Sequence, residues 1–425
     1  MTLEATPGTL NANHGANNTN GFTRSIHSDV TTPKNQLPVQ TRTTLLTGAT
    51  GALGQELMWN FLQNRPSHEK LLVLARGKTK SQNPQDRTAA AQRRVNILLG
   101  QHFSPDELTL VGDRVTVIDG DVTAPYLGLD AKTFANLAQQ VDSVLHCAAA
   151  VRFDQSLVEA RHINVEGTRQ ALQLARHARQ NGREGRFDYI STAYVAGKRK
   201  GLILEDELEH KKGFRNTYEQ SKYEAEQMVR LVQDEIPTTI LRPSIIIGNS
   251  RTGETSNFKA FYWPIRVYAS GQLRLLPGVA NCRVDLVPVD YVAAATLHLT
   301  GLPHTVGGCF HLTTGHDNLV TLREIMDATI EFFSIKPPPL VNPTLVKLLE
   351  GHTGRLLLGE RVYKTLMLGM PYYPYLALNL EFDDTQARQH LDAAGVYAPS
   401  IRDFFNRLFQ YCVETNWGHK APNGH

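Results

Sequence analysis

A chain of 425 residues holds enough material for one large domain or two ordinary ones, and its 41% apolar and 20% charged residues are typical of a globular protein. The 44 basic and 41 acidic side chains leave a net charge of +3, which argues against a nucleic-acid-binding protein with a concentrated basic face. The four cysteines have no ligand spacing, so we predict neither a disulfide framework nor a metal site: Cys147, Cys282, Cys309 and Cys412.

The first 40 residues differ in composition from the rest of the chain. The stretch MTLEATPGTLNANHGANNTNG is rich in Asn, Thr and Gly and has no apolar segment of the kind that a secretory signal needs. We expect residues 1–40 to be disordered, because such a composition offers little surface to bury. No run of about 18 apolar residues occurs, so we predict no transmembrane helix and a cytoplasmic location.

From residue 41 onward, short apolar strands alternate with amphipathic helices. We predict strands at 43–47, 70–76, 115–119, 141–147, 187–191 and 238–241, and helices at 51–63, 85–99, 165–178 and 218–233. Buried strands that are separated by helices pair in parallel through right-handed crossovers. The predicted fold class is therefore α/β, with a doubly wound parallel Rossmann sheet over residues 41–250.

The alternation ends near Gly248. We expect residues 251–425 to form a smaller substrate-binding and helical region that packs on the sheet, near the carboxyl ends of the strands where such folds bind ligands. An aromatic patch, FKAFYWPIRVY at 258–268, suits core packing, which we favour, or the lining of an acyl channel. Residues 345–369 have the pattern of an amphipathic surface helix; packing against the domain is favoured over a peripheral membrane contact.

Three glycines stand between the first strand and its helix, in TLLTGATGALG at 44–54. There Gly48, Gly51 and Gly54 would let the backbone approach a pyrophosphate, while the helix N-terminus supplies unpaired N–H groups and a favourable dipole. No Gly-Lys-Ser/Thr follows, so the turn is not a P-loop. The pattern predicts a dinucleotide site, and the alternative is a tight turn without a ligand.

The end of the second strand predicts which dinucleotide binds. An NAD site places an acidic residue there for the ribose 2′-hydroxyl, whereas this strand ends LVLAR, with Arg76. Because a guanidinium matches a 2′-phosphate, we predict NADPH. Lys78 and Arg94 could assist, although we favour solvated surface positions for both. Asp121, after the third strand, could meet the adenine, and the small residues of HCAA (146–149) leave room for the cofactor.

Two further stretches predict acid–base chemistry. ISTAYVAG (190–197) ends the fifth strand, and NTYEQSKYEAE (216–226) opens a helix on which Tyr218 and Lys222 share one face. A free tyrosine titrates near pH 10, and we expect a nearby ammonium to lower its pKa towards the working range. The Thr192 hydroxyl could donate a second hydrogen bond to the same substrate oxygen.

Together these motifs resemble the extended short-chain dehydrogenase/reductase superfamily. The resemblance runs from about residue 43 to 292, through TGATGALG, HCAA, INVEGT, ISTAYV, YEQSK and LRPSIIIG. Within it the chain is most similar to the thioester reductase and fatty acyl-CoA reductase branch, through LLVLARG, GDVTAPYLGL, HCAAAVRFDQSL and VDLVPVDYVAAA. The resemblance implies an NADPH-dependent oxidoreductase of lipid metabolism that reduces acyl thioesters to aldehydes, and to alcohols if a second hydride transfer follows.

The resemblance also implies roles for individual residues. Thr192, Tyr218 and Lys222 would form the catalytic triad, and Arg76 would bind the 2′-phosphate. The residues implied as cofactor contacts are Gly48, Thr50, Gly51, Leu53, Gly54, Arg76, Asp121, Val122, Ala148, Ala149, Lys222, Pro243 and Ile245. No adenylation or carrier domain stands ahead of residue 41, so we expect the acyl group to arrive on CoA or on a separate carrier protein.

Other functions remain open from the sequence. A hydroxysteroid-type dehydrogenase would act on a ketone or secondary alcohol in a similarly apolar pocket. A sugar-nucleotide epimerase would retain NAD, which Arg76 disfavours, and a non-enzymatic NADP sensor is disfavoured by the intact triad. We expect a small-molecule substrate and no nucleic acid or metal, while acyl chain length and oligomeric state stay open.

Overall fold

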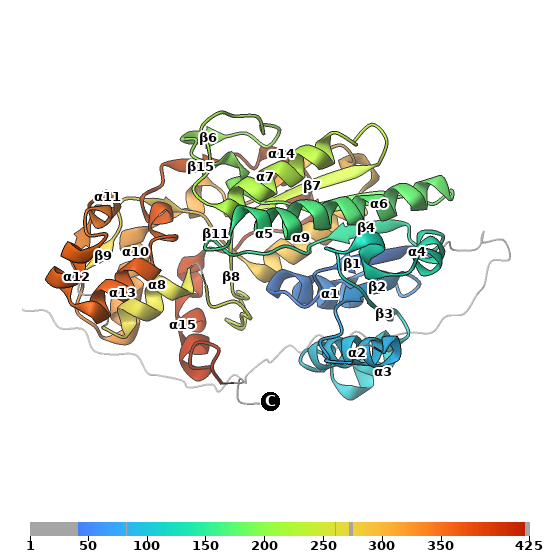
Figure 1. Cartoon of the computed structure of the whole chain (residues 1–425), viewed down its shortest axis with the longest axis horizontal. Coiled ribbons are helices and arrows are strands. Elements are labelled where there is room, and N and C mark those ends of the chain that lie inside the picture. The colour runs from blue at the N-terminus through green and yellow to red at the C-terminus, as the bar shows by residue number, and fades with distance from the viewer. Residues whose placement is uncertain (1–40, 82, 260, 272–274, 421–425) are drawn as a thin grey trace, which may run out of the picture. The chain divides into compact units, whose positions relative to one another are not determined.

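The computed structural model describes residues 41–420, apart from residues 82, 260 and 272–274, so the tail predicted at 1–40 lies outside the described part. Its centre is a seven-stranded sheet in the order β12-β7-β5-β4-β1-β2-β3, in which all neighbouring strands are parallel (Figure 1). The predicted α/β fold class is confirmed. The strands are β1 (Thr43–Thr47), β2 (Lys70–Ala75), β3 (Val115–Asp119), β4 (Ser143–His146), β5 (Arg186–Ile190), β7 (Thr238–Pro243) and β12 (Cys309–Leu312).

The strand order changes direction between β1 and β4. Doubly wound sheets bind ligands at this point, outside the carboxyl ends of the strands. The register pairs Thr47 at the end of β1 with His146 at the end of β4. The glycine turn after β1 therefore lies beside the small residues that follow β4.

Helices cover both faces of the sheet. On one face α1 (Ala52–Asn64), α2 (Pro84–Gly100) and α9 (Val289–Gly301) share a core that includes Leu57, Val95 and Val292. On the other face α4 (Ala131–Ala138), α6 (Gly167–Gln180) and α7 (Thr217–Arg230) bury Phe134, Leu174 and Val229. Two further helices connect strands of the sheet, α3 (Pro105–Gly112) and α5 (Leu157–Arg161). A π-helical turn, His162–Glu166, joins α5 to α6.

The sequence analysis did not predict the seventh strand of the sheet, β12. β12 is only four residues long, CFHL, and follows two glycines, so it carries little of the pattern that identifies a strand. It pairs with β7 and lies beyond residue 250, where the sequence analysis divides the chain. The division into 41–250 and 251–425 stays a prediction.

A second group of elements follows β7. The helices α8 (Tyr262–Ala269), α10 (Leu322–Phe333) and α15 (Phe405–Glu414) share an apolar core that includes Ile265, Ile325 and Phe409. Four short strand pairs lie outside the main sheet: β6 (Gly201–Ile203) with β15 (Leu380–Phe382), β8 (Ile245–Ile247) with β11 (Leu286–Pro288), β9 (Leu276–Pro277) with β14 (Leu340–Val341), and β10 (Arg283–Val284) with β13 (Val320–Thr321). Helix α14 (Thr385–Leu391) packs against α9 and β12.

The single amphipathic helix predicted at 345–369 is wrong. The structure has three short helices there: α11 (Pro343–Lys347), α12 (His352–Leu358) and α13 (Glu360–Leu368). Gly351 and Gly359 separate them, with φ angles of 96° and 75° that a continuous helix cannot contain. Val346 and Leu366 are buried in a small apolar core, as expected for packing against the domain. Among the described residues, every helix is too short or too polar to span a membrane.

Candidate active site

A cavity of about 1280 Å³ brings the predicted site residues together. Every residue predicted for catalysis or cofactor contact lines it, although these residues come from the ends of β1, β2, β3, β4, β5 and β7 and from β8, α1 and α7. The carboxyl ends of parallel strands meet at one edge of the sheet, which explains this convergence. Their individual roles stay predictions.

The glycine turn is shaped for close approach of backbone. Gly48 has a φ of 74°, and a Cβ at this position would lie 2.6 Å from the amide nitrogen of Ala148. A Cβ on Gly54 would lie 2.1 Å from the carbonyl oxygen of Gly48. Gly51, which caps α1, is exposed and has no neighbour closer to such a Cβ than 3.4 Å. The first turn of α1 therefore opens into the cavity, and this arrangement fits a dinucleotide pyrophosphate.

Three basic side chains lie at the end of β2. Arg76 makes an ion pair with Asp121, with Nη1 3.5 Å from Oδ2, and its side chain is 64% exposed. Arg94 of α2 donates a 2.6 Å hydrogen bond from Nη1 to the Arg76 carbonyl oxygen. Both Arg94 and Lys78 line the cavity, and Lys78 is also exposed, in agreement with the surface position favoured from the sequence. Three cations grouped in this way fit a phosphate group.

The predicted catalytic residues approach the cavity from β5 and α7. Helix α7 begins after Asn216, whose side-chain oxygen accepts a 3.0 Å hydrogen bond from the Glu219 amide, so Tyr218 lies in the first turn. Lys222 follows one turn later on the same face. Thr192, two residues after β5, is buried and donates a 3.4 Å hydrogen bond to the Pro243 carbonyl oxygen.

The electrostatics differ from the expected arrangement. Burial raises the pKa of Tyr218 above its ordinary value, and a hydrogen bond with the Thr192 side chain offsets this only in part. Burial lowers the pKa of Lys222 to about 7. The Lys222 Nζ donates 2.7 Å hydrogen bonds to the Tyr189 hydroxyl and the Ile190 carbonyl oxygen. Tyr218 is thus a protonated hydrogen-bond donor, and the expected lowering of its pKa by Lys222 does not occur in this structure.

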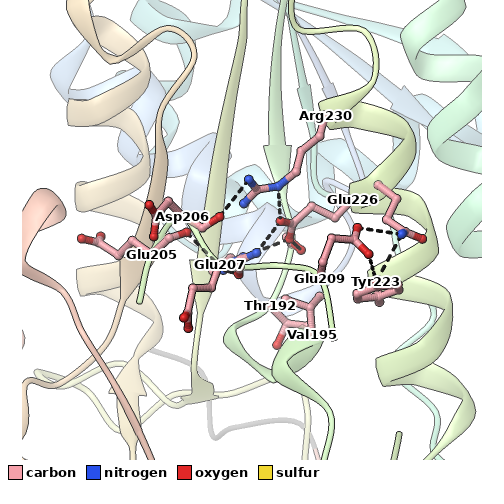
Figure 2. A network of polar contacts seen from close by, with 12 residues as sticks. Thr192, Val195, Glu205, Asp206, Glu207, Glu209, Tyr223, Glu226 and Arg230 are labelled. Atoms are coloured by element: carbon pink, nitrogen blue, oxygen red, sulfur yellow. Dashed lines mark hydrogen bonds and ion pairs between the residues drawn. The ribbon is translucent and has the colours of Figure 1, made fainter. Parts of the chain in front are cut away.

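A buried ionic network behind these residues was missed in the sequence. Glu226, one turn after Lys222, accepts a 2.6 Å hydrogen bond from the Ser191 hydroxyl, next to Thr192. It also accepts hydrogen bonds of 2.6 and 3.0 Å from Arg242 of β7 and one of 3.0 Å from Arg230. Figure 2 shows the hydrogen bond between Glu226 and Arg230, which lie one turn apart on α7. The network ties α7 to the ends of β5 and β7.

The far part of the cavity is apolar. Its lining between residues 258 and 411 contains no Asp, Glu, Lys, Arg or His among the described residues. Side chains from α8 and α10 contribute to it, including Ile265, Ile325 and Met326, as does Phe261, which precedes α8. Part of the aromatic patch at 258–268 therefore lines the cavity, while Tyr262 of that patch is buried in the core.

Comparison with known proteins identifies the family. The model of an NAD-binding family described as male sterility protein matches residues 46–296. The chain belongs to this family. Male sterility proteins of this kind form the thioester reductase and fatty acyl-CoA reductase branch of the extended short-chain dehydrogenase/reductases, so the resemblance seen in the sequence is confirmed.

Relatives within this male sterility family differ in size and setting. A linear gramicidin synthase protein of Brevibacillus parabrevis is 29% identical over 299 residues, which are 68% of this chain and 6% of that protein. Probable fatty acyl-CoA reductase 5 of Arabidopsis thaliana is 24% identical over 72% of this chain and 73% of its own length. The crystal structure of the terminal R domain from the myxalamid PKS-NRPS biosynthetic pathway matches with a TM-score of 0.72 and 26% identity, over 90% of this chain and 92% of that domain.

The family membership settles the coarse chemistry. A male sterility family protein with this site is an oxidoreductase that uses a nicotinamide cofactor. Among the described residues, no group of three or more His, Cys, Asp or Glu side chains is arranged to hold a metal ion.

Proposed function

We propose that this protein is an NADPH-dependent reductase of acyl thioesters, carried by CoA or by a carrier protein, with an aldehyde as the first product. The observation that carries the proposal is the pairing of two different surfaces in one cavity. One end has the open glycine turn and the cations Arg76, Lys78 and Arg94, and the other end is a largely apolar chamber to which α8 and α10 contribute side chains. An aliphatic acyl group suits such a chamber, because burying apolar surface there is favourable.

The residues that would hold the cofactor follow from this arrangement. The first turn of α1 would bind the pyrophosphate, Arg76 with its neighbours the 2′-phosphate, and Pro243 and Ile245 would flank the nicotinamide. The small side chains of Ala148 and Ala149 leave space beside the turn. When bound, NADPH supplies the hydride that reduces the thioester carbon.

The chain's own residues would act on the thioester oxygen. Thr192 and Tyr218 both line the cavity and can donate hydrogen bonds to that oxygen as it gains negative charge. Because burial keeps the phenol of Tyr218 protonated, it can pass its proton to the oxygen and give a hemithioacetal. Return of that proton to the phenolate would accompany cleavage of the C–S bond. The aldehyde and, after protonation of the sulfur, a free thiol would then leave.

Lys222 would act from its position against the end of β5. Its hydrogen bonds to Tyr189 and Ile190 hold it against β5, one helical turn from Tyr218. A pKa of about 7 means that it exchanges protons readily near neutral pH. This property suits a residue that delivers to the site the proton which the departing sulfur takes up in each turnover.

The rival functions are disfavoured to different degrees. The diphosphate of a sugar nucleotide needs cationic partners in the substrate part of the site; the described lining from 258 to 411 offers none, and Lys420 is the one cation that lines the cavity after it. A ketone or secondary alcohol would fit the same apolar chamber, so only the products distinguish a dehydrogenase function from thioester reduction. Release of a thiol occurs only with a thioester.

The test follows NADPH absorbance and free thiol together in the purified protein. The substrates are acyl-CoAs whose acyl chains range from about two to about eighteen carbons. Apolar ketones and a UDP-sugar form the comparison set. One thiol released for the first NADPH consumed supports the proposal. Turnover of a ketone with no thioester activity would replace it with the dehydrogenase function.

A further inference from the structure

We propose that Tyr375, which is distant from Tyr218 in the sequence, is a positioning residue for Tyr218. The C-terminal region then takes part in the chemistry as well as in binding the acyl group. Tyr375 lies on a short 3₁₀-helix, Tyr373–Ala377, and its side chain is buried. The role assigned to Tyr218 rests on the proposed function. The contacts that join Tyr375 to α7 do not depend on the substrate.

The hydrogen bonds of the Tyr375 hydroxyl go to the start of α7, on both sides of Tyr218. Its hydroxyl donates a 2.5 Å hydrogen bond to Oε1 of Glu219, which is fully buried. The same hydroxyl accepts a 2.7 Å hydrogen bond from Nδ2 of Asn216, the residue that caps α7. Arg215 completes the group, since its amide and guanidinium both donate to Glu219, at 2.9 and 3.2 Å.

The ring of Tyr375 reaches Tyr218 by a second, apolar route. It stacks on Phe153 with a centroid distance of 5.3 Å, and Phe153 lies 5.9 Å from the Tyr218 ring. It also meets the ring of Tyr194, which follows Thr192, edge-on at 5.3 Å. All of these rings line the cavity. One side chain therefore contacts the segments on both sides of the reacting position.

A helix needs this support at its first turn more than elsewhere. The first N–H groups of α7 have no partner within the helix, and terminal turns open more easily than helix interiors. Asn216 uses its side-chain oxygen as the cap, so its amide nitrogen is left to donate to Tyr375. Removing the Tyr375 hydroxyl would take a donor from buried Glu219 and an acceptor from Asn216 at once, and would loosen the turn that carries Tyr218.

The chain offers a matched control on the same 3₁₀-helix. Tyr373 is also buried, but its hydroxyl donates to the Leu366 carbonyl oxygen, at 2.8 Å, and it does not line the cavity. Tyr375→Phe and Tyr373→Phe therefore each remove one hydroxyl group from a buried tyrosine of the same 3₁₀-helix. Only Tyr375→Phe removes hydrogen bonds to the start of α7.

Two measurements on these variants test the inference. Hydrogen exchange of the backbone amides at 217–220, in the protein without substrate, should become at least about tenfold faster in Tyr375→Phe and stay within twofold of wild type in Tyr373→Phe. With the substrate that the wild type turns over best, kcat of Tyr375→Phe should fall by about tenfold or more, because small misplacement of a catalytic group is costly. Its KM for NADPH should stay within about twofold.

The outcomes separate this inference from the proposed function. Equal exchange rates in the two variants, or an unchanged kcat in Tyr375→Phe, would overturn the role of Tyr375. A matching rise in the NADPH KM would also overturn it, because that would indicate general loosening of the site. If the wild type reduced no thioester at all, the proposed function would fail, and the exchange measurement would still decide whether Tyr375 holds the first turn of α7.

Discussion

The buried position of Lys222 predicts an unusual dependence of stability on pH. In the folded protein burial lowers the pKa of Lys222 to about 7, whereas an unfolded lysine titrates near pH 10.4. Between these values the unfolded chain binds a proton that the folded chain does not, so the free energy of unfolding rises with pH. At about 1.4 kcal/mol per pH unit, the contribution of Lys222 should grow by about 4 kcal/mol from pH 7 to pH 10.

Lys222→Met isolates this contribution. The variant keeps a side chain of similar length but cannot bind a proton, so it lacks the pH dependence that comes from Lys222. It also leaves the Tyr189 hydroxyl and the Ile190 carbonyl oxygen without their donor, at about 1–3 kcal/mol each, but that loss is independent of pH. The difference between the two proteins should therefore be flat below pH 7 and widen above it, in favour of wild type.

Urea unfolding of both proteins at one-unit steps from pH 6 to pH 10 measures this difference. Titrating groups that do not interact with Lys222 cancel in the comparison, whereas His146 and Cys147 lie within reach of its charge. Curves that run parallel across the whole range would refute the argument, because they would mean that Lys222 has the same pKa in the folded and unfolded chains. The variant should have lost its reductase activity at every pH.

Three further predictions concern the two ends of the cavity. Gly54→Ala should lower the midpoint of thermal unfolding sharply, because its Cβ would lie 2.1 Å from the Gly48 carbonyl oxygen, whereas Gly51→Ala should fold and instead weaken NADPH binding in a fluorescence titration. Arg76→Glu should raise the Kd for NADPH by about tenfold or more, since a charged hydrogen bond contributes roughly 1.5–3 kcal/mol. The Kd for NADH should stay nearly unchanged, and equal losses of affinity for both cofactors would argue against a 2′-phosphate site. Met326→Trp should raise KM for long acyl chains but not for short ones, and a uniform change across chain lengths would place the acyl group elsewhere.

Local patterns in the sequence predicted most of the sheet and the identity of the site-lining residues. Strands such as KLLVLA and TTLLT carry consecutive apolar residues at their centre, and the structure has them within a residue or two of the predicted bounds. The predicted site residues converge because parallel strands end at one edge, which is a property of the fold class itself. β12 was missed because four residues carry too little pattern.

Long-range side-chain pairing could not be predicted in this way. Glu219 and Tyr375 are 156 residues apart, and Ser191 and Glu226 are 35 apart, with no periodicity that relates either pair. The charge state of Tyr218 was also misjudged for a physical reason. The four-residue spacing to Lys222 predicts proximity, but burial outweighs it, and β5 supplies better partners for the ammonium.

The central claim is that Tyr218 supplies the proton for reduction of a thioester. The most direct test measures thiol released per NADPH consumed, with the preferred acyl thioester, in Tyr218→Phe and in the control Tyr223→Phe. Tyr223 lies on the same helix, but its hydroxyl donates to Glu209, at 2.9 Å, and it does not line the cavity. We predict that Tyr218→Phe binds NADPH normally and releases thiol about 100-fold more slowly or worse, while Tyr223→Phe keeps the wild-type rate. Thiol release by Tyr218→Phe at the wild-type rate would contradict the account.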